Sequence, residues 1–153
     1  MALFLERADF ARPELAAFLQ AHLDDLAPTA PAKSRHALDV SALQSRSVRL
    51  WVVYDGEQIV GTGALATLIR GHEELKSMRT DPARRREGIG RLMLDHLLKD
   101  AGRRGVFRVS LETGSMNFFA PARAMYEAAG FIYCAPFGKY VQDPNSVFMT
   151  LVL

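Results

Sequence analysis

The sequence has one cysteine, Cys134, which excludes an internal disulfide as a source of stability. Its histidines and cysteine show no spacing typical of a zinc site, and we expect no bound metal. No stretch approaches the roughly 20 uninterrupted apolar residues of a membrane span. The first residues, MALFLERADF, lack the cationic start of a secretory signal peptide. These absences predict a cytoplasmic protein that does not act at a membrane.

An excess of charge of one sign is also missing. The chain carries 19 Lys and Arg against 17 Asp and Glu, a formal net charge of +2. So small an excess does not indicate a nucleic-acid partner by itself. The 153 residues are 49% hydrophobic and 24% charged, which is ordinary for a globular protein. With no internal repeat and no low-complexity segment, we expect one domain over residues 1–153.

The alternation and periodicity of apolar residues predict the order of strands and helices. Predicted strands cover residues 2–6, two runs within 48–69 joined by Asp55-Gly56, 73–78, 106–113, 131–137 and 146–153. Predicted helices cover residues 12–28, 34–44 with Ser34 as N-cap, a long segment from about Gly88 to Gly102, and 120–130. Antiparallel hairpins come first and a β-α-β unit follows. This order favours an α/β (α+β) fold, with a mixed sheet covered by helices.

The long helix has one apolar face. The residues expected to pack on the sheet are Ile89, Leu92, Met93, Leu97 and Ala101. The residues expected to project away from it are Arg91, Asp95, Lys99 and Asp100. Packing therefore explains this helix from about Leu92 onward, but it does not explain the first turn.

That first turn, within ARRREGIGRLM (83–93), carries the strongest functional signal of the chain. The first N–H groups of a helix have no internal partner and bear partial positive charge. Glycines at 88 and 90 leave these groups open to an anion, and Arg84, Arg85 and Arg86 add positive charge. The pattern favours a phosphate or pyrophosphate site. The alternative is a relaxed junction of loop and helix with solvated arginines.

Three segments together resemble the GNAT superfamily of N-acetyltransferases. Residues Arg85 to Gly90, RREGIG, resemble its R/Q-x-x-G-x-G/A signature. ELKSMRTDP (74–82) is similar to the family's bulged fourth strand and turn, and ARAMYEAAGF (122–131) to its "A…LYE..GF" segment. The resemblance extends from about residue 2 to 153, and the segments are similar to one small bacterial subgroup. It implies a mostly antiparallel sheet of about seven strands, splayed between strands 4 and 5 and flanked by about four helices.

The resemblance also implies acetyl-CoA as cosubstrate. The main-chain amides of residues 86–91 would hold its pyrophosphate, and a main-chain N–H near Met78 to Thr80 would polarise the thioester carbonyl. The predicted cofactor-binding residues are Met78, Arg79, Thr80, Arg85, Arg86, Glu87, Gly88, Ile89, Gly90, Arg91 and Asn117. Asn117 stands two residues farther from Tyr126 than the family's pantetheine-binding Asn usually does.

By the resemblance, Tyr126 stands at the position of the family's general acid. A phenol suits this role because it is protonated at neutral pH and can donate to the leaving thiolate. Glu74, on the fourth strand, is the predicted general base, with Glu73 pointing to the opposite face. His36 and Tyr140 are predicted to bind the acceptor. Packing for Tyr126 and a solvated strand end for Glu74 are the alternatives. His22, His72 and His96 are expected at the surface.

The predicted activity is acetyl transfer to a primary amine by direct attack in a ternary complex. The acceptor is expected to be a small molecule or a peptide, with no nucleic-acid partner. A homodimer is common among proteins of this fold and is one possible assembly of this chain. Two other functions stay open. One is a GNAT-like domain that binds coenzyme A without turnover. The other is a nucleic-acid-binding module using Arg103-Arg104 and the three arginines, although acidic residues interrupt them.

Overall fold

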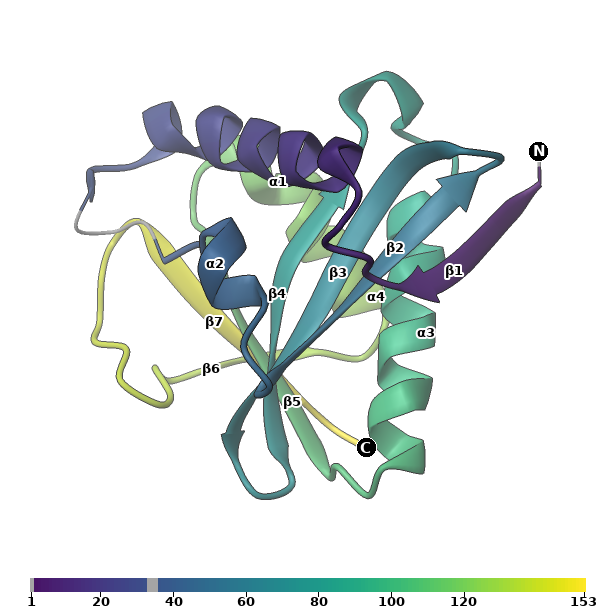
Figure 1. The fold of residues 1–153 in the computed structure, drawn as a ribbon. Coiled ribbons are helices and arrows are strands. Elements are labelled where there is room, and N and C mark those ends of the chain that lie inside the picture. Colours follow the sequence, from purple (N-terminus) through teal and green to yellow (C-terminus); the bar gives the residue numbers. More distant parts are fainter. Residues whose placement is uncertain (1, 33–35) are drawn as a thin grey trace.

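The computed structural model describes residues 2–32 and 36–153. Within them, one seven-stranded sheet has helices on both faces (Figure 1). The strands are β1 (Leu3–Arg7), β2 (Val48–Asp55), β3 (Gln58–Ile69), β4 (His72–Thr80), β5 (Arg108–Gly114), β6 (Ile132–Cys134) and β7 (Ser146–Val152). The helices are α1 (Pro13–Leu26), α2 (Val40–Leu43), α3 (Ile89–Arg103) and α4 (Ala120–Ala128), with short 3-10 turns η1 (Ala27–Thr29), η3 (Pro82–Arg84) and η4 (Asn117–Phe119). No helix among the described residues is long and apolar enough to cross a membrane.

The strand order is β1-β2-β3-β4-β5-β7-β6. β4 and β5 pair in parallel, and the other neighbours in the sheet pair antiparallel. The parallel pair follows from the chain between them, because α3 carries it back across the sheet. The predicted mixed, mostly antiparallel sheet with about seven strands and four helices is confirmed.

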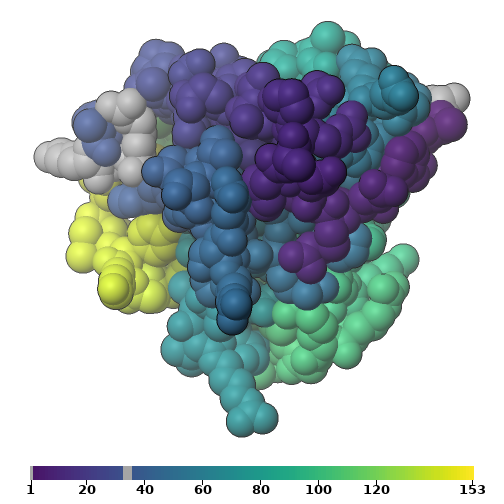
Figure 2. Space-filling view, viewed as in Figure 1, coloured from purple at the N-terminus to yellow at the C-terminus, as the bar shows by residue number. Residues whose placement is uncertain are grey.

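Alternation along the strands divides the core into two layers. On β2, Leu50 and Val52 pack with α1 and α2, whereas Val53 packs on the other face with α3. In Figure 1, α1 and α2 lie in front of the sheet. Figure 2 shows that purple and blue atoms of this front layer cover much of the same face, with yellow atoms of the C-terminal part of the chain beside them. The front layer therefore forms a separate wall over the middle of the sheet.

Two glycines of β3 allow α3 to approach the sheet closely. A Cβ at Gly63 would lie 2.6 Å from Cγ of Met93 and 2.9 Å from Cδ1 of Leu97. A Cβ at Gly61 would lie 2.8 Å from Cγ2 of Ile89. Because these contacts are far shorter than van der Waals separation, side chains at both positions would push the helix away. The glycines therefore set the height of the first turns of α3 above the sheet.

The helix predicted over residues 34–44 is wrong in extent. Of its described residues, 36–44, only 40–43 are helical, and residues 36–39 are irregular. The carboxylate of Asp39 accepts the N–H of Ala42 at 2.8 Å, so Asp39 is the N-cap. The predicted cap, Ser34, lies outside the described residues. The main-chain oxygen of His36 accepts a hydrogen bond from Lys76, which helps to hold that segment against β4 instead of in a helix.

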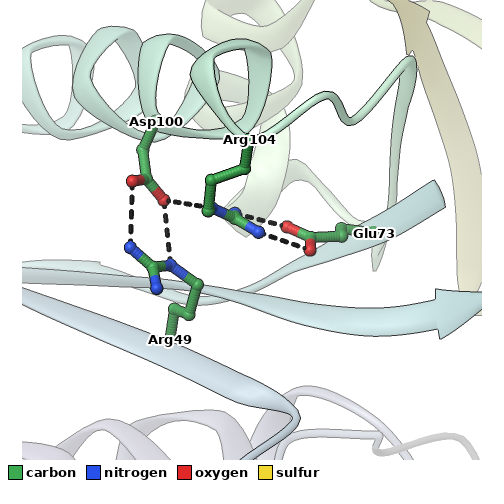
Figure 3. A network of polar contacts seen from close by, with 4 residues as sticks. All are labelled: Arg49, Glu73, Asp100 and Arg104. Carbon is green, nitrogen blue, oxygen red and sulfur yellow. Dashed lines mark hydrogen bonds and ion pairs between the residues drawn. The ribbon is translucent and has the colours of Figure 1, made fainter. Parts of the chain in front are cut away.

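The prediction that Asp100 projects away from the sheet is also wrong. Asp100 is buried, with its carboxylate bonded to Arg49 of β2 at 3.0 and 3.1 Å and to Arg104 at 3.1 Å. Arg104 in turn makes two hydrogen bonds to Glu73 of β4, at 2.8 and 2.7 Å (Figure 3). This network joins the end of α3 to two strands. Charge periodicity did not reveal it because the partners are distant in sequence.

The same network determines how Asp100 responds to pH. Burial alone would raise the pKa of Asp100, but hydrogen bonds and charges from Arg49 and Arg104 outweigh it, so the pKa lies below its ordinary value of 3.8. A carboxyl with a lowered pKa stabilises the folded state above its ordinary pKa, and this contribution fades as pH falls through the folded value.

Asp100→Asn is therefore expected to lower the free energy of unfolding by about 1–3 kcal/mol at pH 7, since hydrogen bonds to charged groups contribute that much. Urea denaturation at pH 7 and at pH 3 measures the effect, which shrinks at the lower pH. Asp95→Asn is the control, because Asp95 pairs with Arg91 on the exposed surface and such pairs contribute about 0–1 kcal/mol. Equal losses in the two variants would contradict this assignment.

Candidate active site

A β-bulge interrupts β4 near its middle. Thr62 faces Arg79 and Ala64 faces Lys76 across the β3–β4 ladder, so Gly63 alone faces both Ser77 and Met78. Ser77 has a φ of 55°, in the left-handed region that non-glycine residues rarely adopt. The Thr62 hydroxyl donates to the Ser77 carbonyl at 2.9 Å and holds this geometry. Strand four thus has a bulge, as the family resemblance implied.

β4 and β5 separate just before the bulge. Their parallel pairing runs from His72 opposite Arg108 to Leu75 opposite Leu111 and ends there. β4 continues to Thr80 and β5 continues to Gly114 without pairing to each other. The expected splay is present, and it leaves main-chain polar groups on both strands without a partner in the sheet.

A cavity of about 160 Å³ lies at the splay and passes between the two layers. Met78 lines it from β4, Glu112 from β5, and Tyr126 from α4. His22 from α1 and His36 line its front end. We call this cavity the cleft. It is the place where groups from both faces of the sheet meet.

The start of α3 presents main-chain donors to solvent. Gly88 is the N-cap with a φ of 80°, and no atom lies within 4 Å of the position a Cβ would take. The first internal bond of the helix runs from the Leu92 N–H to the Gly88 carbonyl, which leaves the N–H groups of residues 89–91 without helical partners. Arg85 and Arg86 are exposed beside them. The arrangement suits an anion such as pyrophosphate.

The loop before α3 is anchored by Arg84. Its guanidinium bonds Glu87 at 3.0 Å and Asp55 at 2.9 Å, which ties the loop to the β2–β3 turn. Of the predicted cofactor residues in the loop, Glu87 therefore uses its side chain within the protein and offers its main chain. Gly90 lies under α4, because its Cβ would stand 3.2 Å from Sδ of Met125.

The other predicted cofactor residues divide into two groups. Met78 and Thr80 lie on the part of β4 that does not pair with β5, and Met78 lines the cleft. Arg79 lies between them, with its side chain paired to Asp25 of α1 at 2.8 Å, so its main chain alone faces the splay. Asn117 is exposed at the start of η4 and does not line the cleft. The structure therefore does not bring Asn117 to the other predicted residues.

Tyr126 is buried in the cleft wall and packs against Phe131. Burial raises the pKa of its phenol well above the ordinary value of 10.0. The hydroxyl therefore keeps its proton throughout the neutral range. A protonated phenol facing the cleft can donate to an anion that forms there.

The front of the cleft holds a compact polar cluster. The ammonium of Lys76 donates to the Glu74 carboxylate at 3.2 Å, to the Tyr140 hydroxyl at 3.1 Å and to the His36 carbonyl at 3.1 Å. Tyr140 also donates to Glu74 at 2.5 Å. Three of the predicted residues, Glu74, His36 and Tyr140, are thus brought together. Glu73 points to the opposite face, as expected, where it binds Arg104.

A second cavity of about 630 Å³ adjoins this cluster and opens outward. Glu74 and Tyr140 line it, together with Leu68, Ile69 and Val141. His36 lines both cavities. The polar cluster therefore stands between the cleft and a wider, largely apolar outer cavity.

The three histidines expected at the surface are each partly buried. His22 lines the cleft, and burial, with a smaller contribution from Arg79, lowers its pKa to about 4. His72 bonds Ser110 at 2.7 Å, and the rings of His96 and Trp51 meet edge to face, with 4.2 Å between their centroids. Burial lowers the pKa of both rings. All three are therefore neutral at pH 7.

Sequence reasoning missed Lys76 and Glu112 as groups of the cleft. The alternation of side chains along a strand could have indicated both residues. Lys76 lies on the same face of β4 as Glu74, and Glu112 lies on the same face of β5 as Ser110. Asn145, which also lines the cleft, comes from a segment with no pattern that could have indicated it.

A split sheet, open main-chain donors at a helix start and a buried phenol between them define an acyl-transfer class of protein. Residues 46–133 match the model of the acetyltransferase (GNAT) domain. Over 93% of its length the chain is 42% identical to the N-acetyltransferase YsnE of Bacillus subtilis, covering 94% of that protein. The chain belongs to the GNAT family and is an N-acetyltransferase.

Solved structures agree on the fold. A protein of Klebsiella pneumoniae, thought to be an acyl-CoA N-acyltransferase, superposes with a TM-score of 0.82 and 29% identity over 99% of this chain and 97% of that one. An acetyltransferase of Bacillus subtilis in complex with CoA superposes with a TM-score of 0.70 and 15% identity over 99% of both chains. The GNAT fold is therefore shared across the whole length.

Gly88→Val is expected to weaken coenzyme A binding at least tenfold, because the side chain enters the space in front of the helix amides. Isothermal calorimetry with coenzyme A measures the affinity. Gly56→Val in the β2–β3 turn is the control, since Gly56 also has a positive φ, 61°, with open space around it. Both variants suffer backbone strain, and only the first loses affinity. Equal affinities would contradict an anion site at this helix start.

Proposed function

We propose that the protein transfers an acetyl group from acetyl-CoA to a primary amine, by direct attack within a ternary complex. The observation that carries the proposal is the splay, which is lined by Met78 of the bulge on one strand, by β5 on the other, and by the buried phenol of Tyr126. A thioester lying there has a main-chain donor on one side and a proton donor near its sulfur.

The cosubstrate fits the open groups of this chain. The amides of residues 86–91 would bind the pyrophosphate, where the lack of a side chain at Gly88 leaves room for it. The exposed Arg85, Arg86 and Arg91 would add attraction. The pantetheine arm would lie along the unpaired edges of β4 and β5 and take up their main-chain hydrogen bonds.

The carbonyl of the thioester gains negative charge as the amine attacks. A main-chain N–H between Met78 and Thr80 would stabilise that charge, and such donors contribute about 2.7–4 kcal/mol in acyl-transfer enzymes. The bulge interrupts the β3–β4 ladder at Ser77 and Met78, at the start of this segment. The bond from Thr62 to the Ser77 carbonyl keeps them in place before substrate arrives.

Tyr126 would act as the general acid. When the carbon–sulfur bond breaks, the thiolate takes the phenolic proton and leaves as the free thiol of coenzyme A. Burial raises the pKa of Tyr126, so the acid form is present at neutral pH. Its place on the α4 side of the cleft is opposite the polar cluster at which the amine would enter.

The amine has to lose a proton before it attacks. An alkyl amine with a pKa near 10.4 is mostly protonated at pH 7, and freeing it costs about 4–5 kcal/mol. Two carboxylates lie near the place where the amine would enter: Glu112 lines the cleft, and Glu74 lines the outer cavity and bonds Lys76 of the cleft wall. The role of Glu74 as general base remains a prediction from the sequence. Glu112 is the other carboxylate able to serve.

The acceptor would enter from the front layer. The outer cavity and the cleft offer an apolar compartment next to a narrow polar one. We propose an acceptor with a primary amine, either a small molecule or the end of a peptide, whose remaining part occupies the outer cavity. His36 and Tyr140 would contact it, since both line that cavity. A homodimer stays a prediction.

A thiol-release assay tests the proposal directly. Acetyl-CoA is incubated with spermidine, kanamycin, glycine and an alanine-terminated tripeptide, and free coenzyme A is measured, with product mass confirming N-acetylation. Release stimulated by at least one amine is expected. Binding of coenzyme A by calorimetry without release for any amine would leave a binding domain and refute the proposed transfer.

Tyr126→Phe is expected to lower kcat about 100-fold or more while leaving the KM for acetyl-CoA within a factor of about three, because the ring and its packing remain. Steady-state thiol release at saturating amine measures both constants. Tyr133→Phe is the matched control, since Tyr133 is exposed and its hydroxyl bonds Glu127 outside the cleft. An unchanged kcat in Tyr126→Phe would remove the phenol from the mechanism.

A further inference from the structure

Glu112 lies at the point where the two strands part. The last parallel pair is Leu75 with Leu111, so Glu112 is the first residue of β5 beyond the pairing. Leu111 packs in the core behind the sheet, and Ser110 bonds His72 on the front face. Because side chains alternate along a strand, Glu112 faces the front like Ser110. Glu112 lines the cleft, together with Met78 and Tyr126.

Glu74, the other carboxylate, is already engaged. Its Oε2 atom accepts both the Lys76 ammonium and the Tyr140 hydroxyl, and its side chain is only 8% exposed. Taking a proton from an acceptor would require Glu74 to give up the charge that holds Lys76. Removing one partner of such a buried pair is costly. Glu74 is therefore better suited to hold the cluster than to accept a proton.

Glu112 is not committed in this way. None of the ion pairs formed within residues 2–32 and 36–153 involves it. Burial raises the pKa of its carboxyl, and Ser146, His36 and Lys76 only partly offset that rise, to which Glu74 adds. A raised pKa brings a carboxylate nearer to the value at which a base works best at neutral pH.

The charges around Glu112 also favour an ammonium. The groups that face it are Glu74 and Lys76 from β4, His36 from the segment before α2, and Tyr140 from the segment before β7. Lys76 is matched by Glu74, and His22, in the same cleft, is neutral. An ionised Glu112 thus gives the front of the cleft one more carboxylate than ammonium. A cationic acceptor restores the balance.

We propose that Glu112, and not Glu74, is the general base of the transfer, and that Glu74 is a positioning residue that holds Lys76 and Tyr140. The acceptor ammonium gives one proton to Glu112, and the neutral amine attacks the thioester carbonyl carbon. The carbon–nitrogen bond forms and the carbon–sulfur bond breaks. The thiolate takes the proton of Tyr126, which a second amine proton replaces, and Glu112 releases its proton to solvent.

This inference rests on the proposed transfer, and its test uses the full chain with the amine of the thiol-release panel that gives the highest rate. Glu112→Gln is expected to lower kcat/KM for the amine about 100-fold or more at pH 7, with coenzyme A affinity unchanged by calorimetry. The wild-type pH profile has an acidic limb, because Glu112 has to be ionised. In Glu112→Gln that limb is lost, and the residual rate rises in proportion to the free amine.

Glu74→Gln provides the contrast. It is expected to raise the KM for the amine while the acidic limb of the profile remains, because the base is still present. Glu127→Gln is the matched control, since Glu127 is an exposed carboxylate that bonds Tyr133 outside the cleft. Its rate and profile are expected to equal those of the wild type.

A second measurement follows the proton itself. Infrared difference spectra between acidic and neutral pH are expected to contain a carboxylic-acid C=O band that Glu112→Gln removes and Glu74→Gln retains. Loss of the acidic limb in Glu74→Gln, or a wild-type profile in Glu112→Gln, overturns the assignment while the transfer itself stands. No thiol release by the wild type with any amine of the panel overturns both.

Discussion

The interruption of hydrogen bonding between β4 and β5 is the constraint on which the rest of the molecule depends. Ser77 and Met78 share one partner on β3, and the pairing of β4 with β5 ends at Leu75. A closed sheet would satisfy its own main-chain groups and leave none for a ligand. Because the sheet opens, groups from the front layer and from α4 can reach the same small volume. The cleft is a consequence of that missing pairing.

Local signals in the sequence were sufficient for much of this architecture. The Asp55-Gly56 turn, the apolar face of the long helix and the glycines before it each act within a few residues, and each feature is present in the structure. The position of Tyr126 on α4 followed from the family resemblance, and the structure brings that residue into the cleft wall. Such features depend on propensity and periodicity, which a chain carries locally.

Features that depend on distant partners were not predictable in the same way. Asp100 has the pattern of an exposed helical residue, yet Arg49, 51 positions away, makes its burial favourable. Lys76 and Tyr140 are separated by 64 residues. The helix α2 begins after its N-cap Asp39, although the sequence pattern predicted a helix that begins at residue 34. Alternation along the strand is enough to place Glu112 on the same face of the sheet as Ser110. Its position where β4 and β5 separate is known only from the register of their pairing in the structure.

The glycines of β3 have a consequence for how this domain can diversify. Because the side chains of Ile89, Met93 and Leu97 lie directly on Gly61 and Gly63, the face of β3 beneath α3 has no room for larger side chains. On the other face, α1 and α2 pack over the sheet, and a cavity of about 630 Å³ opens beside the stretch before β7. Larger side chains can therefore be accommodated around that cavity without moving α3, whereas a side chain at Gly61 or Gly63 would displace the helix.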